Sequence, residues 1–476
     1  MYDPVGPAVL SSAETVDLME RVSGPVLLPD DAGYQTECAT FNLMTTLRPA
    51  IAVGATSVTD VQAAVRFAAE RDLPVAVLAT GHQMVRSAEG ALLINMSRMN
   101  AVHVDPARNL ARVEGGTRWQ QVLGETDKYG LAPVSGTSPT VGVVGYHLGG
   151  GASPILGRRY GYAADYVRAI EIVTADGELR RVNAESEPDL FWALRGGKGN
   201  FGVVTALEFT LFPVKRFYGG GLFFAGEHAT KVLHAWREWV VGLPMEMSSS
   251  VAFLRQPSLP VVPEPLRGKF VMHMRFSSLR PQEEAERILA AVRGIGPTIL
   301  DTIAELPYRE AGSLFTDPPA PVPWVERSTV LRDFPLEAAN ALLAVLGSDS
   351  DTQLSFVELR PLGGALERPP AAPNAVAGRS ARWSVFASGG GRPDLAPVFE
   401  EQLTTLVEAL APWAQDEMMP NLLSARQGAT SAELRAIYGP ERYDRLAAIK
   451  KRYDPRNLFR INHNITPGYG EAGRRF

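Results

Sequence analysis

A single histidine follows a short apolar stretch that is typical of a buried strand. The segment VAVLATGHQMVRS, residues 75–87, continues through Thr80 and Gly81 to His82. An imidazole in this place could bind a metal, accept a proton, cap a helix or fill a loop, so its role depends on partners elsewhere. No two histidines have the H-x-x-x-H spacing and Cys38 is the only cysteine, so the sequence has no zinc motif and no internal disulfide.

A second group of residues with chemical potential is the glycine cluster at residues 142–151. Five of these ten residues are glycines, namely Gly142, Gly145, Gly149, Gly150 and Gly151. A backbone without side chains can approach a ligand closely, and its N–H groups can bind phosphate or carbonyl oxygens. The alternative is a surface loop, but the apolar residues between the glycines favour a ligand site.

Residues 197–202 read GKGNFG, a literal match to the dinucleotide-binding pattern G-x-G-x-x-G. That pattern requires a strand before it and a helix after it, so that the helix N-terminus faces a pyrophosphate. Here the helix-like DLFWALRG precedes the glycines and the strand-like VVTALEF follows them. We therefore reject NAD binding at this loop. The sequence also lacks the G-x-S-x-G turn of serine hydrolases.

The elements around the histidine are expected to form a strand–helix–strand unit. Residues 50–53 and 75–78 are apolar enough for buried strands, and residues 61–68 carry apolar positions at helical spacing. Ser57, with Asp60 three residues later, is typical of a helix start. So short a unit predicts two parallel strands, and open α/β sheets bind ligands at the carboxyl ends of such strands.

The region from about 217 to 420 has a different texture, with strands of alternating polarity. In KFVMHMRF, residues 269–276, the side chains of Phe270, Met272, Met274 and Phe276 share one face, while Val271, His273 and Arg275 share the other. One face is expected to pack in a core and the other could line a cavity. The tail from about Ser431 has helical and then extended character, and we expect it to return to the first domain.

The composition limits the partners of this chain. The 476 residues carry a net charge of -5 with basic and acidic residues intermixed, which gives no basic surface for nucleic acid or an anionic membrane. No apolar stretch reaches the length of about 18 residues that suggests a membrane span, and residues 1–22 lack a signal peptide pattern. A small-molecule substrate and a cytoplasmic location are expected. The oligomeric state is left open.

Five stretches together resemble the berberine-bridge-enzyme-like oxidoreductases of the vanillyl-alcohol-oxidase flavoprotein superfamily. They are ATGH (79–82), GTSPTVGVVGYHLGGG (136–151), RRYGYAADYV (158–167), PDLFWALRGGKGNFGVVT (188–205) and YDPRNLFRINHNI (453–465). The resemblance implies an α+β fold, in which a PCMH-type FAD-binding domain of two α/β subdomains adjoins a substrate domain with a central antiparallel sheet covered by helices. It places the FAD-binding domain in residues 1–215, the substrate domain in 216–420 and a segment completing the FAD-binding domain in 421–476.

The same resemblance implies a covalent bond between His82 and the 8α carbon of FAD. A neutral imidazole nitrogen is a nucleophile that can add to the methide tautomer of the flavin 8-methyl group. Ser138 stands where many relatives carry a second flavin-binding cysteine, so a single bond is expected. The implied cofactor contacts are His82, Ala79, Thr80, Gly81, Gln83, Ser138, Val141, Gly142, Gly145, Gly149, Gly202, Val204 and Asn462.

The reaction that the resemblance implies is hydride transfer from substrate to flavin N5, followed by electron transfer to dioxygen to give hydrogen peroxide. Val141 occupies a position where valine is associated with oxidases. The proton acceptor that we predict is Glu358, whose alternative is a structural ion pair with Arg360 or Arg382. Tyr146 is a second catalytic residue in this prediction. The rival functions are a dehydrogenase of the same fold, and a flavin-binding cyclase or binding protein without net redox chemistry.

Overall fold

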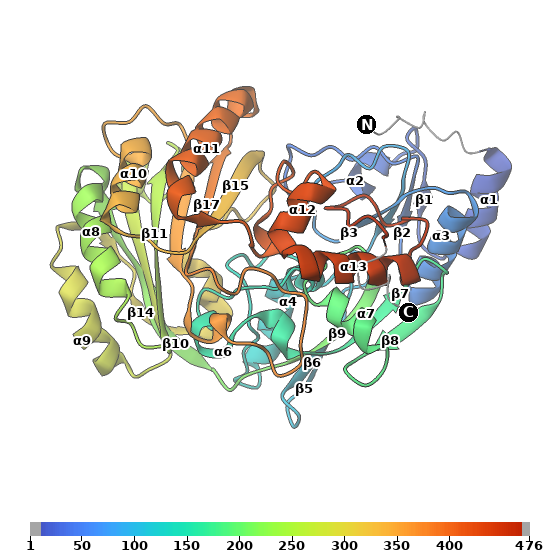
Figure 1. Cartoon of the computed structure of the whole chain (residues 1–476), viewed down its shortest axis with the longest axis horizontal. Coiled ribbons are helices and arrows are strands. Elements are labelled where there is room, and N and C mark those ends of the chain that lie inside the picture. The colour runs from blue at the N-terminus through green and yellow to red at the C-terminus, as the bar shows by residue number, and fades with distance from the viewer. Residues whose placement is uncertain (1–10, 469–476) are drawn as a thin grey trace.

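The computed structural model describes residues 11–468, which form three β-sheets and the helices around them (Figure 1). Two smaller sheets lie at one end of the molecule and a large antiparallel sheet lies at the other. Residues 1–10, which belong to the segment inspected for a signal peptide, lie outside the described part of the chain. Residues 469–476, at the end of the predicted C-terminal segment, also lie outside it.

The first sheet contains the predicted strand–helix–strand unit. Its strands, in spatial order, are β1 (Val26–Leu27), β2 (Ile51–Gly54), β4 (Leu92–Asn95) and β3 (Val75–Leu78). β2 and β3 are parallel as predicted, although β4 lies between them and pairs with both. The intervening helix α3 (Val58–Glu70) begins where the Ser57 hydroxyl accepts a hydrogen bond from the Asp60 amide at 3.2 Å. Helices α1 (Ser12–Arg21) and α2 (Tyr34–Glu37) complete this layer.

The second sheet is antiparallel and carries the glycine-rich segments on its connections. Its strands are β5 (Val102–Asp105), β6 (Leu110–Glu114), β9 (Val203–Thr210), β7 (Val167–Val173) and β8 (Leu179–Val182). The connecting helices are α4 (Trp119–Asp127), α5 (Val143–Leu148), α6 (Gly157–Tyr160) and α7 (Pro188–Leu194). The GKGN loop, residues 197–200, lies between α7 and β9, which confirms the helix-before-strand order read from the sequence.

The third sheet is a large antiparallel sheet with one face covered by helices. Its spatial order is β13 (Thr298–Asp301), β10 (Arg216–Ala225), β12 (Phe270–Ser278), β11 (Met247–Arg255), β16 (Phe356–Pro361), β17 (Trp383–Gly390), β15 (Trp324–Leu331) and β18 (Ala414–Gln415), with β14 (Ala304–Pro307) beside β10. The covering helices are α8 (Ala229–Val240), α9 (Gln282–Arg293), α10 (Leu336–Leu346) and α11 (Ala396–Leu410).

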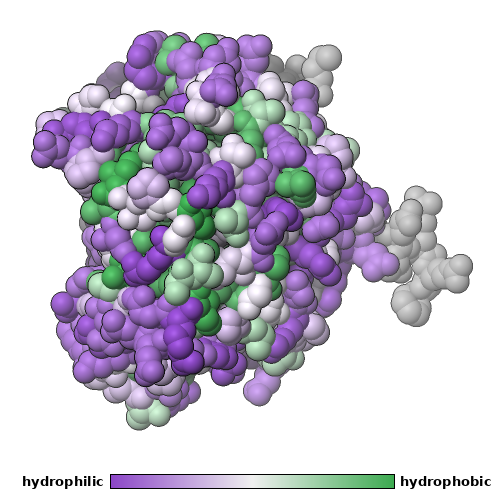
Figure 2. Space-filling view, turned by 90° about the vertical axis from the view of Figure 1, so that its left-hand side faces the viewer, coloured by the Kyte–Doolittle hydropathy of each residue, from purple (hydrophilic) through white to green (hydrophobic). Residues whose placement is uncertain are grey.

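The alternation predicted for β12 is confirmed by the packing. Met272, Met274 and Phe276 lie in the core between the sheet and its helices, whereas His273 and Arg275 lie on the opposite face. The solvent side of the molecule at this end is mainly hydrophilic, with apolar residues scattered in small groups (Figure 2). The helices cover one face of the sheet, so the opposite face, which carries His273 and Arg275, is the one that can contact a ligand or another part of the protein.

The C-terminal tail returns to the first two sheets, as predicted. Helices α12 (Ser431–Tyr438) and α13 (Pro440–Tyr453) precede it, and α13 packs beside α7 (Figure 1). Lys450 and Asp454 form an ion pair at 2.7 Å in which neither side chain is exposed. The Lys450 ammonium also donates to the carbonyls of Asn200 at 2.7 Å and Phe459 at 3.0 Å, while Asp454 accepts from two tail amides.

This buried pair also fixes the edge of the first sheet. The Val75 amide donates to the Leu458 carbonyl at 2.9 Å, which attaches the tail to the start of β3. Asn200 donates from Nδ2 to the His463 carbonyl at 3.2 Å and accepts from the Ile465 amide at 2.9 Å. The GKGN loop therefore clamps the tail, which gives the G-x-G-x-x-G match a structural explanation.

We predict that Asp454→Ala destabilises the protein by about 3–5 kcal/mol, because it leaves the Lys450 charge buried without its partner. The matched control is Glu178→Ala, which removes a largely exposed ion pair with Arg66 and should cost about 1 kcal/mol or less. Urea-induced unfolding followed by circular dichroism compares the two variants. Equal stability of Asp454→Ala and the control would contradict this account of the tail.

Candidate active site

His82 lies on a turn that only glycine can form. Gly81 has a φ of 72°, and a Cβ added to it would lie 2.7 Å from the Thr40 Cα. Backbone amides of segment 40–42 donate to the carbonyls of Thr80 and Gly81 at 3.1 and 3.2 Å. The turn is thereby held at the carboxyl end of β3, where the sequence placed a ligand site.

The His82 imidazole is half-buried, neutral and held from two sides. Its ring stacks on Phe41 with centroids 3.8 Å apart and planes 14° from parallel, and its Nε2 lies 3.0 Å from the Thr140 Oγ1. Burial and the nearby charge of Arg118 lower the pKa of His82 to about 4. When Nε2 carries the proton and donates to Thr140, the lone pair of Nδ1 is free to act as a nucleophile.

Several predicted cofactor residues converge on this histidine. Ser138 is linked to it through Thr140, since the Ser138 and Thr140 hydroxyl oxygens are 2.8 Å apart. Gly142 also lies against the turn, because a Cβ placed on it would be 3.5 Å from the Thr80 side chain and 3.7 Å from the Ala79 Cβ. The structure thus brings together residues of 79–82 with Ser138 and Gly142.

The remaining predicted glycines differ in their surroundings. Gly145, in α5, faces open space, with nothing within 4 Å of the position a Cβ would take. By contrast, a Cβ on Gly149 would overlap the Asn421 Oδ1 at 1.6 Å, and one on Gly202 would lie 2.4 Å from the Val173 carbonyl oxygen. Close backbone packing requires glycine at Gly202, and a larger residue at Gly149 would displace the Asn421 side chain, whereas Gly145 leaves room for a ligand.

Four further predicted contacts come from separate segments. Val141 is half-buried and packs on the core of the second sheet, and Val204 is buried in β9. Gln83 donates from Nε2 to the carbonyls at both ends of segment 421–423, at 3.0 and 2.6 Å. Asn462 donates from Nδ2 to the GKGN loop at 3.1 Å, while its buried Oδ1 has no hydrogen-bond partner.

A half-buried lysine and a half-buried glutamate near His82 were not found from the sequence. Lys198 has a φ of 56°, a conformation that favours glycine, and its ammonium donates to Gln83 and to the Pro420 carbonyl. Glu326 on β15 accepts from the Trp324 indole at 2.6 Å, and the Trp324 ring lies 6.4 Å from His82. Burial raises the pKa of Glu326 to about 7 and lowers that of Lys198 to about 8.

Strand register collects polar side chains on the uncovered face of the third sheet. Residues directly opposite each other in antiparallel strands share a face. Ser250 lies opposite Arg275, Ala252 lies opposite both His273 and Glu358, and Ser388 lies opposite Glu326. The polar residues of this face include Arg275, His273, Ser250, Glu358, Arg360, Ser384, Ser328 and Glu326, with Phe356 and Phe386 among them.

Glu358 is saturated by hydrogen bonds from cationic and hydroxyl donors. Its Oε1 accepts from the Ser250 hydroxyl at 2.7 Å and from the Arg275 guanidinium at 2.8 Å, and its Oε2 accepts from Arg360 at 2.8 Å. Although burial opposes ionisation, the two guanidiniums hold the pKa of Glu358 at about 2. A carboxylate stabilised in this way is a weak proton acceptor. The geometry therefore favours the alternative role of Glu358 as a structural ion pair, whose partners are Arg360 and Arg275 and not Arg382.

Tyr146 is fixed by glycines on both sides of its ring. A Cβ on Gly136 would lie 2.9 Å from the ring and a Cβ on Gly151 would lie 2.4 Å from it. The phenol oxygen is buried without a hydrogen-bond partner, and burial raises its pKa well above the usual value. Tyr146 therefore stays protonated and can act only as a hydrogen-bond donor or neutral acceptor.

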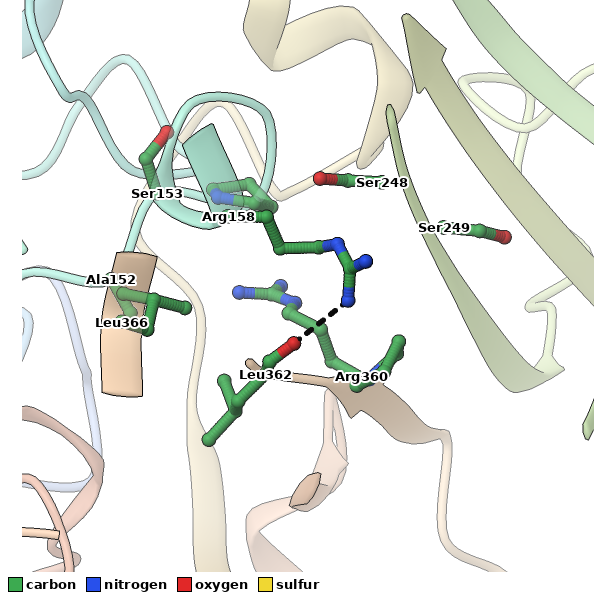
Figure 3. Close-up of a pocket in the computed structure, with 10 residues that line it drawn as sticks. Ala152, Ser153, Arg158, Ser248, Ser249, Arg360, Leu362 and Leu366 are labelled. Carbon is green, nitrogen blue, oxygen red and sulfur yellow. Dashed lines mark hydrogen bonds between the residues drawn. The ribbon is translucent and has the colours of Figure 1, made fainter. Parts of the chain in front are cut away.

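Arg158 joins the glycine-rich region to the third sheet (Figure 3). Its guanidinium donates to the carbonyls of Leu362, Met247 and Leu243 at 2.9, 3.1 and 3.0 Å. The cavity beside it, lined also by Arg360, has a volume of about 10 Å³. That volume holds one water molecule at most, so this cavity is a joint between the two layers rather than a substrate site.

The residues around His82 are chemically suited to a flavin. A neutral nucleophilic imidazole, open space at Gly145 and the unpartnered Asn462 Oδ1 match a flat, polar-edged cofactor. Within residues 11–468 no cluster of three or more His, Cys, Asp or Glu could hold a metal ion, and no helix there is long and apolar enough to cross a membrane. Fold and site together define an FAD-linked oxidoreductase.

Comparison with known proteins specifies the family. An FAD binding domain matches residues 49–183, and a berberine and berberine-like domain matches residues 434–466. (R)-6-hydroxynicotine oxidase of Paenarthrobacter nicotinovorans is 30% identical over 468 residues, which cover 94% of this chain and 97% of that protein. The chain belongs to the berberine-bridge-enzyme-like FAD-linked oxidoreductases.

Solved structures confirm the predicted fold. The crystal structure of 6-hydroxy-D-nicotine oxidase from Arthrobacter nicotinovorans matches with a TM-score of 0.81 at 27% identity, covering 94% of this chain and 98% of that one. Xylooligosaccharide oxidase from Myceliophthora thermophila shares the fold with a TM-score of 0.81 at 22% identity, covering 96% and 99% of the two chains.

Proposed function

We propose that this protein is an FAD-dependent oxidase whose flavin is held by one covalent bond from His82. Bound FAD would accept hydride from a small or medium organic substrate, such as an alcohol, an amine or a secondary-metabolite intermediate, and would pass electrons to dioxygen to give hydrogen peroxide. The observation that carries the proposal is the half-buried neutral His82, whose Nε2 is engaged by Thr140 while Nδ1 is left to act as a nucleophile. The names of the relatives, which include oxidases of 6-hydroxynicotine and xylooligosaccharides, agree with it. A cytoplasmic location and the domain limits 1–215, 216–420 and 421–476 belong to the same proposal.

A single bond follows from the residues that surround the second attachment position. The Ser138 hydroxyl is hydrogen-bonded to Thr140 and has no adjacent base to make it a nucleophile. Cys38 lies in the core beside the first sheet, where burial raises its pKa to about 11 and keeps the thiol protonated. Neither residue is suited to a second flavin bond.

We assign proton acceptance to Glu326 rather than to Glu358. Both carboxylates lie on the uncovered face of the third sheet, but only Glu326 has a pKa near neutrality. A general base works best when its pKa lies near the operating pH. Its position beside Trp324 and close to the His82 turn supports this role, while Glu358 holds two arginines in place.

Stopped-flow oxidation of the reduced holoenzyme tests the proposal. Anaerobically reduced protein mixed with dioxygen should reoxidise rapidly and release one hydrogen peroxide per flavin. Val141→Ile, which adds one methyl group, should slow this step, because Val141 is placed by the family resemblance beside the oxygen-reacting carbon. Slow reoxidation by dioxygen with fast reoxidation by a quinone would identify a dehydrogenase, and turnover without a product mass change of two hydrogens would identify a cyclase.

The pH dependence tests Glu326. Because a raised pKa leaves this carboxyl protonated in acid, kcat/KM should rise with pH through about 7 and then level off. Glu326→Gln should lower kcat/KM by about 10²–10⁴ and remove this rise. The control is Glu305→Gln, an exposed glutamate on β14. The assay uses the best substrate from a peroxide-release screen of alcohols, amines and sugars, and persistence of the rise in Glu326→Gln would refute the assignment.

A further inference from the structure

The imidazole of His82 is fixed at one nitrogen and on one face of its ring. Its Nε2 lies 3.0 Å from the Thr140 Oγ1, and the Phe41 ring stacks on it with centroids 3.8 Å apart and planes 14° from parallel. Within residues 11–468 its other nitrogen, Nδ1, has no hydrogen-bond partner. The two rotatable bonds of the side chain are thereby held in one orientation, and one nitrogen is left for another partner.

These contacts also decide which nitrogen carries the proton. A neutral imidazole has one N–H donor and one acceptor lone pair. A proton on Nε2 is donated to the Thr140 oxygen, whereas a proton on Nδ1 would find no acceptor in the described part of the protein. The tautomer with the proton on Nε2 is therefore favoured, and its Nδ1 lone pair is the nucleophile.

The Thr140 hydroxyl is in turn oriented by Ser138. Both residues are buried, and their hydroxyl oxygens are 2.8 Å apart. The Thr140 amide also donates to the Ser138 Oγ at 3.4 Å, so the two residues form a local turn. Among the residues that the structure describes, the Thr140 hydroxyl has no partner besides Ser138 and His82. When this hydroxyl donates to Ser138, its lone pairs are left for the Nε2 proton.

The Phe41 ring is held from both sides of the site. Its amide donates to the Thr80 carbonyl in the His82 turn at 3.1 Å, and its carbonyl accepts from the Val322 amide at 3.2 Å. The Phe41 side chain is buried, and the Trp324 ring packs edge-on against it with centroids 6.1 Å apart. Phe41 therefore offers the imidazole a flat surface that is itself fixed.

We propose that Thr140 and Phe41 are positioning residues for the covalent attachment of FAD to His82. Thr140, oriented by Ser138, sets the tautomer, and Phe41 sets the plane of the ring. A nucleophile that is already oriented needs to lose little further freedom when it reacts, which raises the rate of bond formation. The proposal rests on the function proposed above, because it explains how this chain would form the single bond assigned there.

The attachment step balances with dioxygen as the oxidant. One bond forms, between Nδ1 and the 8α carbon of FAD, while one C–H bond of the 8-methyl group and the Nε2–H bond break. The two electrons and two protons released pass to dioxygen and give hydrogen peroxide. Before Nε2 loses its proton the ring carries positive charge, and the Thr140 oxygen stabilises that charge by accepting the Nε2–H hydrogen bond.

The rate at which flavin becomes covalently bound tests the proposal without an activity assay. FAD-loaded protein is purified early after induction and incubated with FAD under air, and samples are precipitated with acid at intervals to separate bound from released flavin. Thr140→Val keeps the shape of the side chain and removes the hydroxyl, so it should bind FAD but attach it at least about tenfold more slowly. Thr140→Ser, which keeps the hydroxyl, should attach FAD within about threefold of the unmodified rate.

Two further variants complete the design. Phe41→Leu should also slow attachment, because it removes the stacked ring and keeps an apolar side chain. The matched control is Thr405→Val, which removes the hydroxyl of an exposed threonine on α11 that donates to the Glu401 carbonyl at 3.1 Å. This control should attach FAD at the unmodified rate. Circular dichroism establishes that each variant is folded.

Several results would overturn the proposal. Attachment at the unmodified rate in Thr140→Val would do so, and so would equally slow attachment in Thr140→Ser, since packing would then be the cause. Loss of all flavin from folded Thr140→Val would assign Thr140 to cofactor binding, and an unmodified rate in Phe41→Leu would end the role of Phe41.

One measurement needs no variant. Nitrogen NMR spectroscopy of the flavin peptide from the unmodified protein should show a bond at Nδ1, and a bond at Nε2 would overturn the assigned tautomer. An unmodified yellow protein that releases all of its flavin in acid would refute the covalent bond in the proposed function, whereas the failures of the variants would leave that bond standing.

Discussion

The buried ion pair between Lys450 and Asp454 is the constraint on which the cofactor site depends. All three ammonium hydrogens of Lys450 have acceptors, and one of these is the Asn200 carbonyl in the GKGN loop. Asp454 in turn accepts hydrogen bonds from backbone amides of the tail. The Leu458 carbonyl of the tail accepts a hydrogen bond from Val75, the first residue of β3. Because β3 leads directly into the His82 turn, a contact between distant parts of the chain supports the edge on which the histidine stands.

The pKa values of the titratable groups in the site are set by desolvation together with the charged or polar groups beside each of them. His82 is made neutral by desolvation and a nearby arginine, which gives a nucleophile where a cation would be inert. On the facing sheet two carboxylates have pKa values that differ widely, since Glu326 is partly desolvated beside an indole and Glu358 lies between two guanidiniums. A pair of acids separated in this way allows one to move protons and the other to position cations.

Local sequence patterns predicted much of the fold, and long-range contacts account for what they missed. The strand–helix–strand unit, the Ser57 helix start and the two faces of β12 follow from spacing within a few residues. The convergence of the His82 turn with Ser138 and Gly142 was implied by family motifs. Glu358 and Arg275 are 83 residues apart and meet through strand register, which no local pattern encodes. Lys198 lies in the loop before β9 of the second sheet and Glu326 lies on β15 of the third, and they gave no signal beyond a lysine in a glycine-rich loop.

Peptide mapping of the purified holoprotein tests the central claim most directly. Trypsin cuts after Arg71 and Arg86 and releases residues 72–86, which contain His82, while residues 129–158 contain Ser138. Mass spectrometry should find the mass of FAD on peptide 72–86 and none on peptide 129–158, and His82→Ala should yield flavin that acid releases. An unmodified peptide 72–86 from flavin-loaded protein, or flavin on any other peptide, would contradict the assignment of His82 as the single covalent anchor.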